Sequence, residues 1–492
     1  GLSAGLGMAL AARIGHRRYR TYVLLGDSEL AEGSVWEAFQ LAGHRRTNNL
    51  TAIVDVNRLG QSGPTMTGHK LADYRRRISS FGWRVIMVNG HDFKQLRAAY
   101  RQAIAEHRRP TCILAKTIKG QGVDFLENKN GWHGRTLSPA QLQTALSEIG
   151  AVSPSLRATI RRPLATRSRT SAAHRAVPIS YPPQTPVATR MAIAKALVRL
   201  GPTFPNMVVL DAEVKNSTYT ENFEQAFPGR FIEAYIAEQN MIGIANGLAA
   251  RGLTPVATTF AAFLTRGFDQ LRMAQYSGTH QVFVGTHAGV SIGPDGPSQM
   301  GLEDIAMFRT LGHSTILYPG DAVAAERLTE LALRGRGLVY LRGTRAATPL
   351  LYKPTTKFRI GGSQTLRSTK RDRATLVAAG ITLGEAIKAA DQLAVSGIAV
   401  RVIDLYSIKP IDSAALRRAV LQTKHLLVIE DHRPEGGIGE AVRSALGPLA
   451  GHVNTLAVAT TPHSATMSEA LSLAGISADH IARRIRAIIK KR

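Results

Sequence analysis

Short apolar runs alternate with helical stretches along most of this chain. In the first 150 residues the runs are TYVLLGD, LTAIVDVN, WRVIMVNG and PTCILAKT. Each is rich in β-branched residues and is bounded by turn-forming residues, which is typical of a strand buried on both faces. Parallel strands joined by helices have both faces of their sheet covered. The alternation therefore predicts an α/β fold in which mostly parallel sheets are flanked by helices.

The same alternation continues in two further blocks. A chain of 492 residues is too long for one hydrophobic core, so several domains are expected. Residues 151–186 hold six Arg, six Pro and no acidic residue, a composition typical of an extended linker. We therefore expect domains at 1–150, 187–352 and 353–492, with a basic, Pro-rich linker at 151–186. The later strand candidates are NMVVLDA, TPVATTFAAF, HQVFVGTH, STILYPG, ATLVAAG, AVRVIDLY and HLLVIED.

The net charge of +27 bears on the ligands that the chain attracts. A basic field draws anions such as sugar phosphates, diphosphates or nucleic acid. The basic residues are spread along the whole chain, and no stripe of interleaved aromatic and basic residues is visible. This distribution favours a generally basic surface, with a specific polyanionic partner as the alternative. Nucleic acid is not expected as a partner.

Other features bear on the compartment. No run of eighteen or more apolar residues appears, which argues against a membrane span. The opening GLSAGLGMALAARIG has no basic region ahead of its apolar residues, so it does not resemble a cleavable signal. The single cysteine, Cys112, cannot form an internal disulfide, which fits a reducing compartment. We expect a cytoplasmic protein without a membrane partner.

Two polar residues follow neighbouring strand candidates and suggest a metal site. Asp27 ends the first run, in LLGDSELAEG, and Asn57 ends the next run thirty residues later. That spacing is about one crossover unit, so both side chains can reach the same edge of the sheet. A carboxylate, an amide oxygen and a loop carbonyl suit Mg²⁺ or Ca²⁺, and backbone N–H groups at Gly26 and Gly33 suit phosphates. The alternative is that Gly-Asp after a strand is simply a turn.

The pair Asp27 and Asn57 resembles the fingerprint of thiamine diphosphate enzymes, in which Gly-Asp-Gly is followed by Asn at a similar spacing. The resemblance implies that Asp27, Asn57 and the main-chain carbonyl of Leu59 hold the metal, and that the metal holds the cofactor's diphosphate. Ser28 stands where the family has its second Gly, so it departs from the pattern at the diphosphate turn.

Glu238 begins a helical stretch after an extended run, in FIEAYIAEQNMIGIANGLA. A Glu at this position is commonly stabilised by the helix dipole. Its surroundings, however, resemble transketolases: AEQNM is followed in order by TTFAAFLTRGFDQLRM and GTHAGVSIGPDGPSQMGLED. Further similar strings, including ELAEGSVWEAF, AKTIKGQG, GWHG and EDHRPEGGIGEAV, extend the resemblance over the whole chain. Gln299 in DGPSQ is typical of the animal-type branch.

The resemblance implies a role for each matching residue around the cofactor. Glu238 would activate thiamine diphosphate by supplying an acid to its pyrimidine ring, and Phe260 and Phe263 would enclose that ring. Gln299 would lie beside the reacting carbonyl. The acidic residue at the position of Glu32 meets the activating Glu of the other subunit in this family, so a homodimer with active sites at the subunit interface is implied.

The substrate site is implied in the same way. A ketose phosphate needs cations for its phosphate and hydrogen bonds for its hydroxyl groups. Lys119 and His133 would lie on a Gly-rich loop that closes over the thiazolium and the substrate. Asp295 would bind a sugar hydroxyl. The implied phosphate ligands are Arg190, Ser217, His287 and Arg345.

We therefore expect a transketolase of the pentose phosphate pathway, which moves a two-carbon ketol unit from a ketose phosphate to an aldose phosphate. The alternatives are another thiamine enzyme, such as deoxyxylulose-phosphate synthase, or a non-catalytic transketolase-like binding protein. Family members carry a segment ahead of the position of Gly1. The chain is thus expected to be a fragment or one half of a split enzyme, or else a minimal form with reduced activity.

Overall fold

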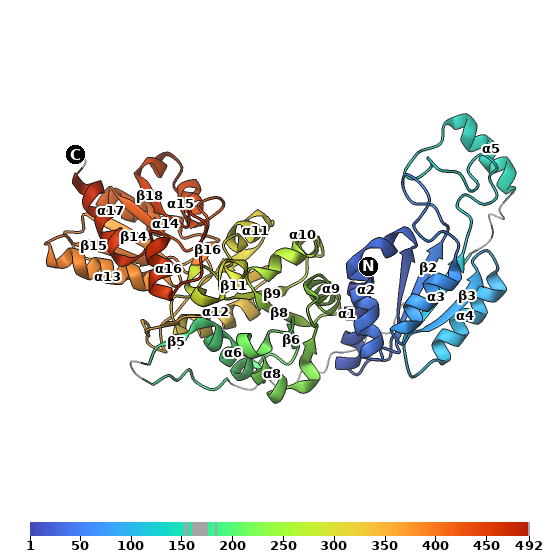
Figure 1. Cartoon of the computed structure of the whole chain (residues 1–492), viewed down its shortest axis with the longest axis horizontal. Coiled ribbons are helices and arrows are strands. Elements are labelled where there is room, and N and C mark those ends of the chain that lie inside the picture. Colours follow the sequence, from blue (N-terminus) through green and yellow to red (C-terminus); the bar gives the residue numbers. More distant parts are fainter. Residues whose placement is uncertain (152–154, 156, 160–175, 183–184, 491–492) are drawn as a thin grey trace. The chain divides into compact units, whose positions relative to one another are not determined.

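The computed structural model describes residues 1–490 except 152–154, 156, 160–175 and 183–184. The chain forms two compact units, Gly1–Ala172 and Ala173–Arg492. Each unit is built from parallel strands and covering helices, as Figure 1 shows, so the predicted α/β class is confirmed. Most of the linker predicted at 151–186 lies outside the described residues.

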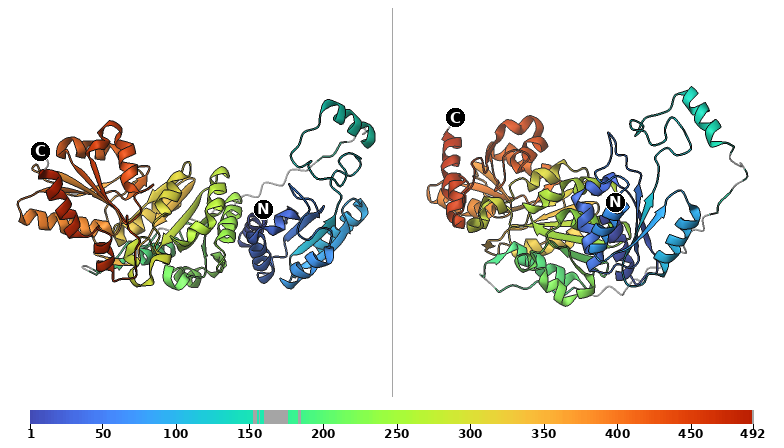
Figure 2. Two further views of the ribbon diagram at one scale, coloured as in Figure 1. Left: turned by 45° about the horizontal axis from the view of Figure 1, so that its top comes forward. Right: turned by 45° about the vertical axis from the view of Figure 1, so that its right-hand side comes forward.

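The first unit contains a four-stranded parallel sheet in the order β1-β2-β4-β3. Its central strands β2 and β4 are almost wholly buried, which explains their unbroken apolar sequences. Helices α1 and α2 pack together, and α3 and α4 both contact β3 (Figures 1 and 2). The strands are β1 (Thr21–Gly26), β2 (Leu50–Val56), β3 (Arg84–Asn89) and β4 (Thr111–Lys116); the helices are α1 (Leu2–Ile14), η1 (Ser28–Ala31), α2 (Gly33–His44), α3 (Leu71–Ser80), α4 (Phe93–Ala105) and α5 (Pro139–Ile149).

The second unit contains a seven-stranded sheet in the order β16-β10-β11-β9-β8-β6-β7. Helices α6 and α12 pack together against it, and α9 packs against β8. The short strands β5 (Val187–Ala188) and β12 (Ala347–Thr348) pair separately. The main strands are β6 (Met207–Asp211), β7 (Phe231–Glu233), β8 (Thr254–Phe260), β9 (Gln281–Thr286), β10 (Thr315–Leu317), β11 (Leu338–Arg342) and β16 (Ser407–Lys409). The helices are α6 (Thr189–Leu200), α7 (Lys215–Thr218), α8 (Glu221–Ala226), η2 (Pro228–Arg230), α9 (Glu238–Ala250), η3 (Phe263–Gly267), α10 (Phe268–Tyr276), η4 (Val290–Asp295), η5 (Pro297–Gln299), α11 (Asp304–Thr310) and α12 (Ala322–Arg334).

The last part of the chain adds a five-stranded sheet in the order β13-β15-β14-β17-β18. Only its edge strand β13 is antiparallel to its neighbour. The strands are β13 (Gln364–Arg367), β14 (Ala374–Ala378), β15 (Val400–Asp404), β17 (Leu426–Ile429) and β18 (Val453–Leu456). The helices are α13 (Thr382–Val395), α14 (Ser413–Thr423), α15 (Ile438–Leu446), η6 (Gly447–His452), α16 (Met467–Leu473) and α17 (Ala478–Lys490).

One strand joins the second and third blocks. β16 comes from the third block but pairs antiparallel with β10 at the edge of the seven-stranded sheet. The two blocks keep separate sheets, yet they form one compact unit, which their sequence patterns alone do not reveal. Within the described residues, no helix has both the length and the apolar character needed to cross a membrane.

Candidate active site

Asp27 and Asn57 follow two neighbouring parallel strands. β1 pairs with β2 so that Gly26 lies opposite Asp55, and the two polar residues therefore leave the sheet at the same edge. Asp27 is buried, and its carboxylate accepts hydrogen bonds from the backbone N–H groups of Ser28 (2.9 Å) and Arg58 (2.8 Å). The spacing between Asp27 and Asn57 thus corresponds to one strand-helix-strand unit, as expected from the sequence.

Thr65 contributes a contact that the sequence did not reveal. Its Oγ1 donates to Oδ2 of Asp27 at 3.2 Å, from the Gly- and Thr-containing loop that follows β2. Burial raises the pKa of Asp27, while the hydrogen bonds from Arg58, Thr65 and Ser28 oppose that rise. The neighbouring carboxylate of Asp55 raises the pKa further. A cation at this position would favour the ionised form of Asp27.

The atoms near Asn57 that are proposed as metal ligands are all oxygens. Oδ1 of Asn57 accepts from the backbone N–H of Leu59 at 3.0 Å, and Nδ2 donates to Oδ2 of Asp55 at 3.1 Å. Among the described residues, no group of three or more His, Cys, Asp or Glu could hold a metal. The set of Asp27, Asn57 and the Leu59 carbonyl instead has one carboxylate, one amide and one carbonyl, which fits a hard cation that keeps diphosphate oxygens and water as further ligands.

The segment after Asp27 contains a short 3₁₀ helix followed by an α-helix. Ser28–Ala31 forms the short 3₁₀ helix η1, and α2 begins only at Gly33, with the exposed Glu32 as its N-cap. In the described part of the chain, open space surrounds the position that a Cβ would take at Gly26 and at Gly33. A cavity of about 360 Å³ lies beside η1 and is lined by residues that include Asp27, Ser28 and Thr65. Asn57 and Leu59 are not among the residues that line this cavity.

Lys119 and His133 share one loop of the first unit. Nζ of Lys119 lies 3.2 Å from Nδ1 of His133, across the segment between β4 and α5. The loop turns at Gly120, where φ is +73° and a Cβ would lie 2.8 Å from Leu126. Only glycine fits this close turn, so the Gly-rich sequence serves the shape of the loop.

Glu238 lies at the first position of α9, as the sequence predicted. Only 3% of its side chain is exposed, and Oε2 lies 3.2 Å from Nη1 of Arg266 in η3. η3 can approach α9 closely because residue 267 is glycine. A Cβ there would lie 2.2 Å from Cδ1 of Ile242 on α9. Arg266 was not among the predicted residues, although it lies inside the FAAFLTRGF string.

Three rings stack one after another beside this helix. Phe260, at the end of β8, stacks on Phe263 with ring centroids 5.0 Å apart. Phe260 also stacks on the imidazole of His287, with centroids 3.8 Å apart. The two phenylalanines predicted to enclose a pyrimidine thus lie together, next to a predicted phosphate ligand.

His287 is held by two polar neighbours. Nε2 lies 2.9 Å from Nη1 of Arg190, and Nδ1 lies 2.9 Å from Oγ1 of Thr286. Burial, together with the positive charges of Arg190 and Arg345, lowers the pKa of His287 to about 3. The imidazole is therefore neutral at physiological pH. Arg190 also donates to the backbone carbonyl of Ser217 at 2.6 Å.

Asp295 and Arg345 contact each other. Oδ1 of Asp295 lies 3.4 Å from Nη1 of Arg345, which also donates to the Ile292 carbonyl at 2.9 Å. The sequence assigned the two residues to different groups of a sugar phosphate and did not reveal this ion pair. Gln299 is the last residue of η5, on the same segment as Asp295. Asp295 and Gln299 therefore lie on the same segment, and Arg345 is bonded to that segment.

Comparisons with known proteins assign the chain to a family. Residues 1–176 match the model of the transketolase thiamine diphosphate binding domain, 185–349 the pyrimidine binding domain and 363–481 the C-terminal domain. Human transketolase is 43% identical over the whole of this chain and 80% of its own length. The chain belongs to the transketolase family. Transketolase-like protein 2 of mouse is 42% identical and is covered over 79% of its length.

A solved transketolase has the same fold. The transketolase of Pichia stipitis in complex with sedoheptulose-7-phosphate superposes with a TM-score of 0.84 at 21% identity, over 100% of this chain and 80% of that one. Membership of the family identifies the protein as a thiamine diphosphate-dependent transketolase, which transfers a two-carbon ketol unit between sugar phosphates. Its cofactors are thiamine diphosphate and, as is typical of the family, a divalent metal ion.

Proposed function

We propose that this transketolase binds the metal diphosphate of its cofactor at Asp27, Asn57 and the Leu59 carbonyl. The support is the shared sheet edge of Asp27 and Asn57, the buried carboxylate and the all-oxygen donor set. The backbone N–H groups of Gly26 and Ser28 already donate to the carboxylates of Glu29 (3.3 Å) and Asp27 (2.9 Å), so in this proposal the metal holds the diphosphate. When bound, thiamine diphosphate supplies the nucleophilic carbon that carries the two-carbon unit.

We propose that Glu238 is the residue that activates the cofactor. The observation that carries this role is a carboxylate that is only 3% exposed at the start of α9, a helix that contacts the elements β8 and η3 carrying the stacked pair Phe260 and Phe263. Glu238 would hold a proton at the pyrimidine ring nitrogen, and the two rings would fix the plane of the pyrimidine and exclude water. Gln299 and His133 would hydrogen-bond the reacting oxygen, and Lys119 would neutralise charge near the diphosphate.

The substrate phosphate is proposed to bind at the cationic cluster of the second unit. Nη1 of Arg190 lies 2.9 Å from Nε2 of His287 and 2.6 Å from the Ser217 carbonyl, and Arg345 adds a second positive charge that lowers the pKa of His287. Neutral His287 would orient Arg190 through its Nε2, the Ser217 hydroxyl would add a hydrogen bond to the phosphate, and Asp295 would accept one from a sugar hydroxyl. Binding of the phosphate would compete with Asp295 for Arg345, because the two side chains lie 3.4 Å apart.

We propose a homodimer in which two subunits complete each active site, with Glu32 of one subunit contacting Glu238 of the other. Exposed apolar side chains just before Glu238 support this: Tyr235 is 42% exposed and Ile236 is 68% exposed. Such residues commonly mark a protein interface. We further propose domain limits of 1–150, 187–352 and 353–492. The single, buried cysteine supports a cytoplasmic location.

A coupled assay tests the proposed chemistry. With Mg²⁺ and thiamine diphosphate, we expect the protein to convert xylulose 5-phosphate plus ribose 5-phosphate and not pyruvate plus glyceraldehyde 3-phosphate. Turnover of the second pair would instead indicate a deoxyxylulose-phosphate synthase. Cofactor binding without turnover of either pair would indicate a transketolase-like binding protein. Sedimentation velocity on the same sample tests the dimer, and a monomer with full activity would contradict it.

A further inference from the structure

Residues 287–302, here called the substrate loop, connect β9 to α11 and carry His287, Asp295 and Gln299. The two ends of the loop meet. The backbone N–H of Gly289 donates to the carbonyl of Gly301 at 2.8 Å, and Ala288 forms a bridge with Gly301. The loop therefore has a closed base at Gly289 and Gly301, and whatever fixes this base fixes the position of its side chains.

Arg342 contacts this base through the Gly301 carbonyl. It is the last residue of β11, it is completely buried, and its Nη2 donates to the Gly301 carbonyl at 2.9 Å. Nε and Nη2 also reach the two carboxylate oxygens of Asp304, at 2.7 and 3.1 Å, where α11 begins. One guanidinium group thus joins the carbonyl at the loop base to the helix that follows the loop.

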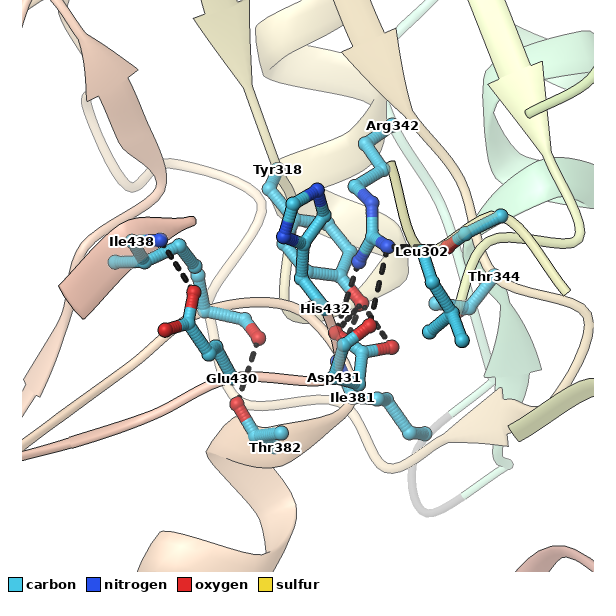
Figure 3. A network of polar contacts seen from close by, with 12 residues as sticks. Leu302, Tyr318, Arg342, Thr344, Ile381, Thr382, Glu430, Asp431, His432 and Ile438 are labelled. Atoms are coloured by element: carbon cyan, nitrogen blue, oxygen red, sulfur yellow. Dashed lines mark hydrogen bonds and ion pairs between the residues drawn. The ribbon is translucent and has the colours of Figure 1, made fainter. Parts of the chain in front are cut away.

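Arg342 also bonds a residue of the third domain (353–492). Nη1 donates to Oδ1 of Asp431 at 2.8 Å, and the Tyr318 hydroxyl donates to the same carboxylate at 3.0 Å. Figure 3 shows Arg342 and Tyr318 pointing towards Asp431. A Cβ at Gly289 would lie 1.8 Å from Oδ2 of Asp431. The carboxylate therefore touches the backbone of the loop base, and it can do so because residue 289 is glycine.

Other residues of the third domain support the loop in the same way. The backbone N–H of Arg433 donates to the Leu302 carbonyl at 3.1 Å. At the far end of the loop, a Cβ at Gly293 would lie 2.9 Å from the Ala465 carbonyl, and one at Gly296 would lie 2.7 Å from Ser464 Oγ. The third domain thus contacts both the base and the tip of the loop.

We propose that Arg342 and Asp431 are positioning residues through which the third domain sets the geometry of the substrate loop. They contact neither the proposed cofactor residues nor the proposed phosphate ligands in the described structure. They act through Gly289 and Gly301 on the placement of Asp295 and Gln299. The inference rests on the proposed function in one respect, namely that Asp295 and Gln299 face the sugar.

The test compares two buried neighbours that differ in their contacts. Asp431→Asn keeps the shape of the side chain but removes the charge that Arg342 and Tyr318 bind. Glu430→Gln is the matched control, because Glu430 is equally buried but accepts hydrogen bonds from the backbone of Ile438 and Gly439 at the start of α15. Both variants are made in the full chain and assayed with saturating Mg²⁺ and thiamine diphosphate.

For Asp431→Asn we expect kcat/KM for xylulose 5-phosphate to fall by about tenfold or more, since a small misplacement of a substrate-binding group has effects of this size. Cofactor affinity, measured by calorimetry, is expected to stay within about twofold, and Glu430→Gln to stay within about twofold in both quantities. A purely structural role would instead give both variants the same loss of activity at the same loss of thermal stability, and that result would overturn the proposal.

Two further variants make the outcome decisive. Tyr318→Phe removes one hydrogen bond to Asp431 and is expected to lower kcat/KM in the same direction, so it decides the matter if Asp431→Asn does not fold. Asp295→Asn separates this inference from the proposed function. Wild-type kinetics in Asp295→Asn would contradict the proposed substrate role of the loop. A loss in Asp295→Asn, with Asp431→Asn and Tyr318→Phe no worse than Glu430→Gln, would overturn the positioning role alone.

Discussion

Nε2 of His287 accepts a hydrogen bond from Nη1 of Arg190 at 2.9 Å. A guanidinium group can only donate, so Nε2 must be unprotonated and the imidazole carries its proton on Nδ1, facing Thr286. Burial lowers the pKa of His287, and the positive charges of Arg190 and Arg345 add to this effect, so His287 stays neutral. In a phosphate site, a neutral imidazole of this tautomer would orient Arg190, and the charge would come from the two arginines.

This relationship predicts a pH-dependent stability. The pKa of His287 falls from 6.5 to about 3 on folding, so between these values the unfolded chain binds a proton that the folded chain does not. The stabilisation is complete above pH 6.5 and is lost as the pH falls towards 3, by up to about 1.4 kcal/mol per pH unit. His287→Gln should flatten the dependence of the urea midpoint on pH between 4 and 6.5. Exposed His463→Gln is the control, and equal slopes in all three proteins would contradict the prediction.

The sequence predicted the parts of the fold that depend on local pattern. Buried strands such as β2 and β4 appear as unbroken apolar runs, and Asp27, Asn57 and Glu238 occupy the strand ends and helix start that their surroundings indicated. These features follow from a few neighbouring residues. Their positions could therefore be expected without knowledge of the tertiary structure.

The sequence did not predict contacts between distant segments. β16 is only three residues long, and its pairing with β10 depends on how two blocks meet. In the same way, Arg342 bonds Asp304 and Asp431 from 38 and 89 residues away. Thr65, which bonds Asp27, and Arg266, which pairs with Glu238, also come from other segments of the chain. No periodicity or motif links such residues, because their contacts arise only after the elements pack.

Replacing Glu238 tests the activating role most directly. Glu238→Gln keeps the size of the side chain but cannot give its proton to a ring nitrogen. We expect kcat to fall by about 10²- to 10⁴-fold, the usual contribution of a positioned acid or base. Steady-state kinetics at saturating cofactor measure the change. Glu221→Gln, at the start of α8, is the control and should retain activity; a kcat for Glu238→Gln within a few fold of wild type would rule out the role.

Removing the metal should remove cofactor binding. In the proposed site the metal joins Asp27 and Asn57 to the diphosphate, so EDTA is expected to abolish the heat of thiamine diphosphate binding and Mg²⁺ or Ca²⁺ to restore it. Asp27→Asn should weaken the metal-dependent affinity by about tenfold or more, because one charged ligand is lost. Asp73→Asn, on α3, is the matched control. Cofactor binding that is equally tight in EDTA would show that the metal lies elsewhere or is not needed.

The ion pair between Arg345 and Asp295 leads to a prediction on substrate choice. If Arg345 binds the substrate phosphate, Arg345→Gln should raise KM for xylulose 5-phosphate by about 10- to 100-fold, which corresponds to the loss of one charge-assisted hydrogen bond. The activity on unphosphorylated xylulose should change little, because that sugar has no phosphate to bind. Lys353→Gln, an exposed cation of the same unit, controls for the general basic field. If Arg345→Gln lowered activity equally on both sugars, the arginine would act by holding Asp295 and Ile292 in the loop, and the phosphate would have to bind at Arg190 alone.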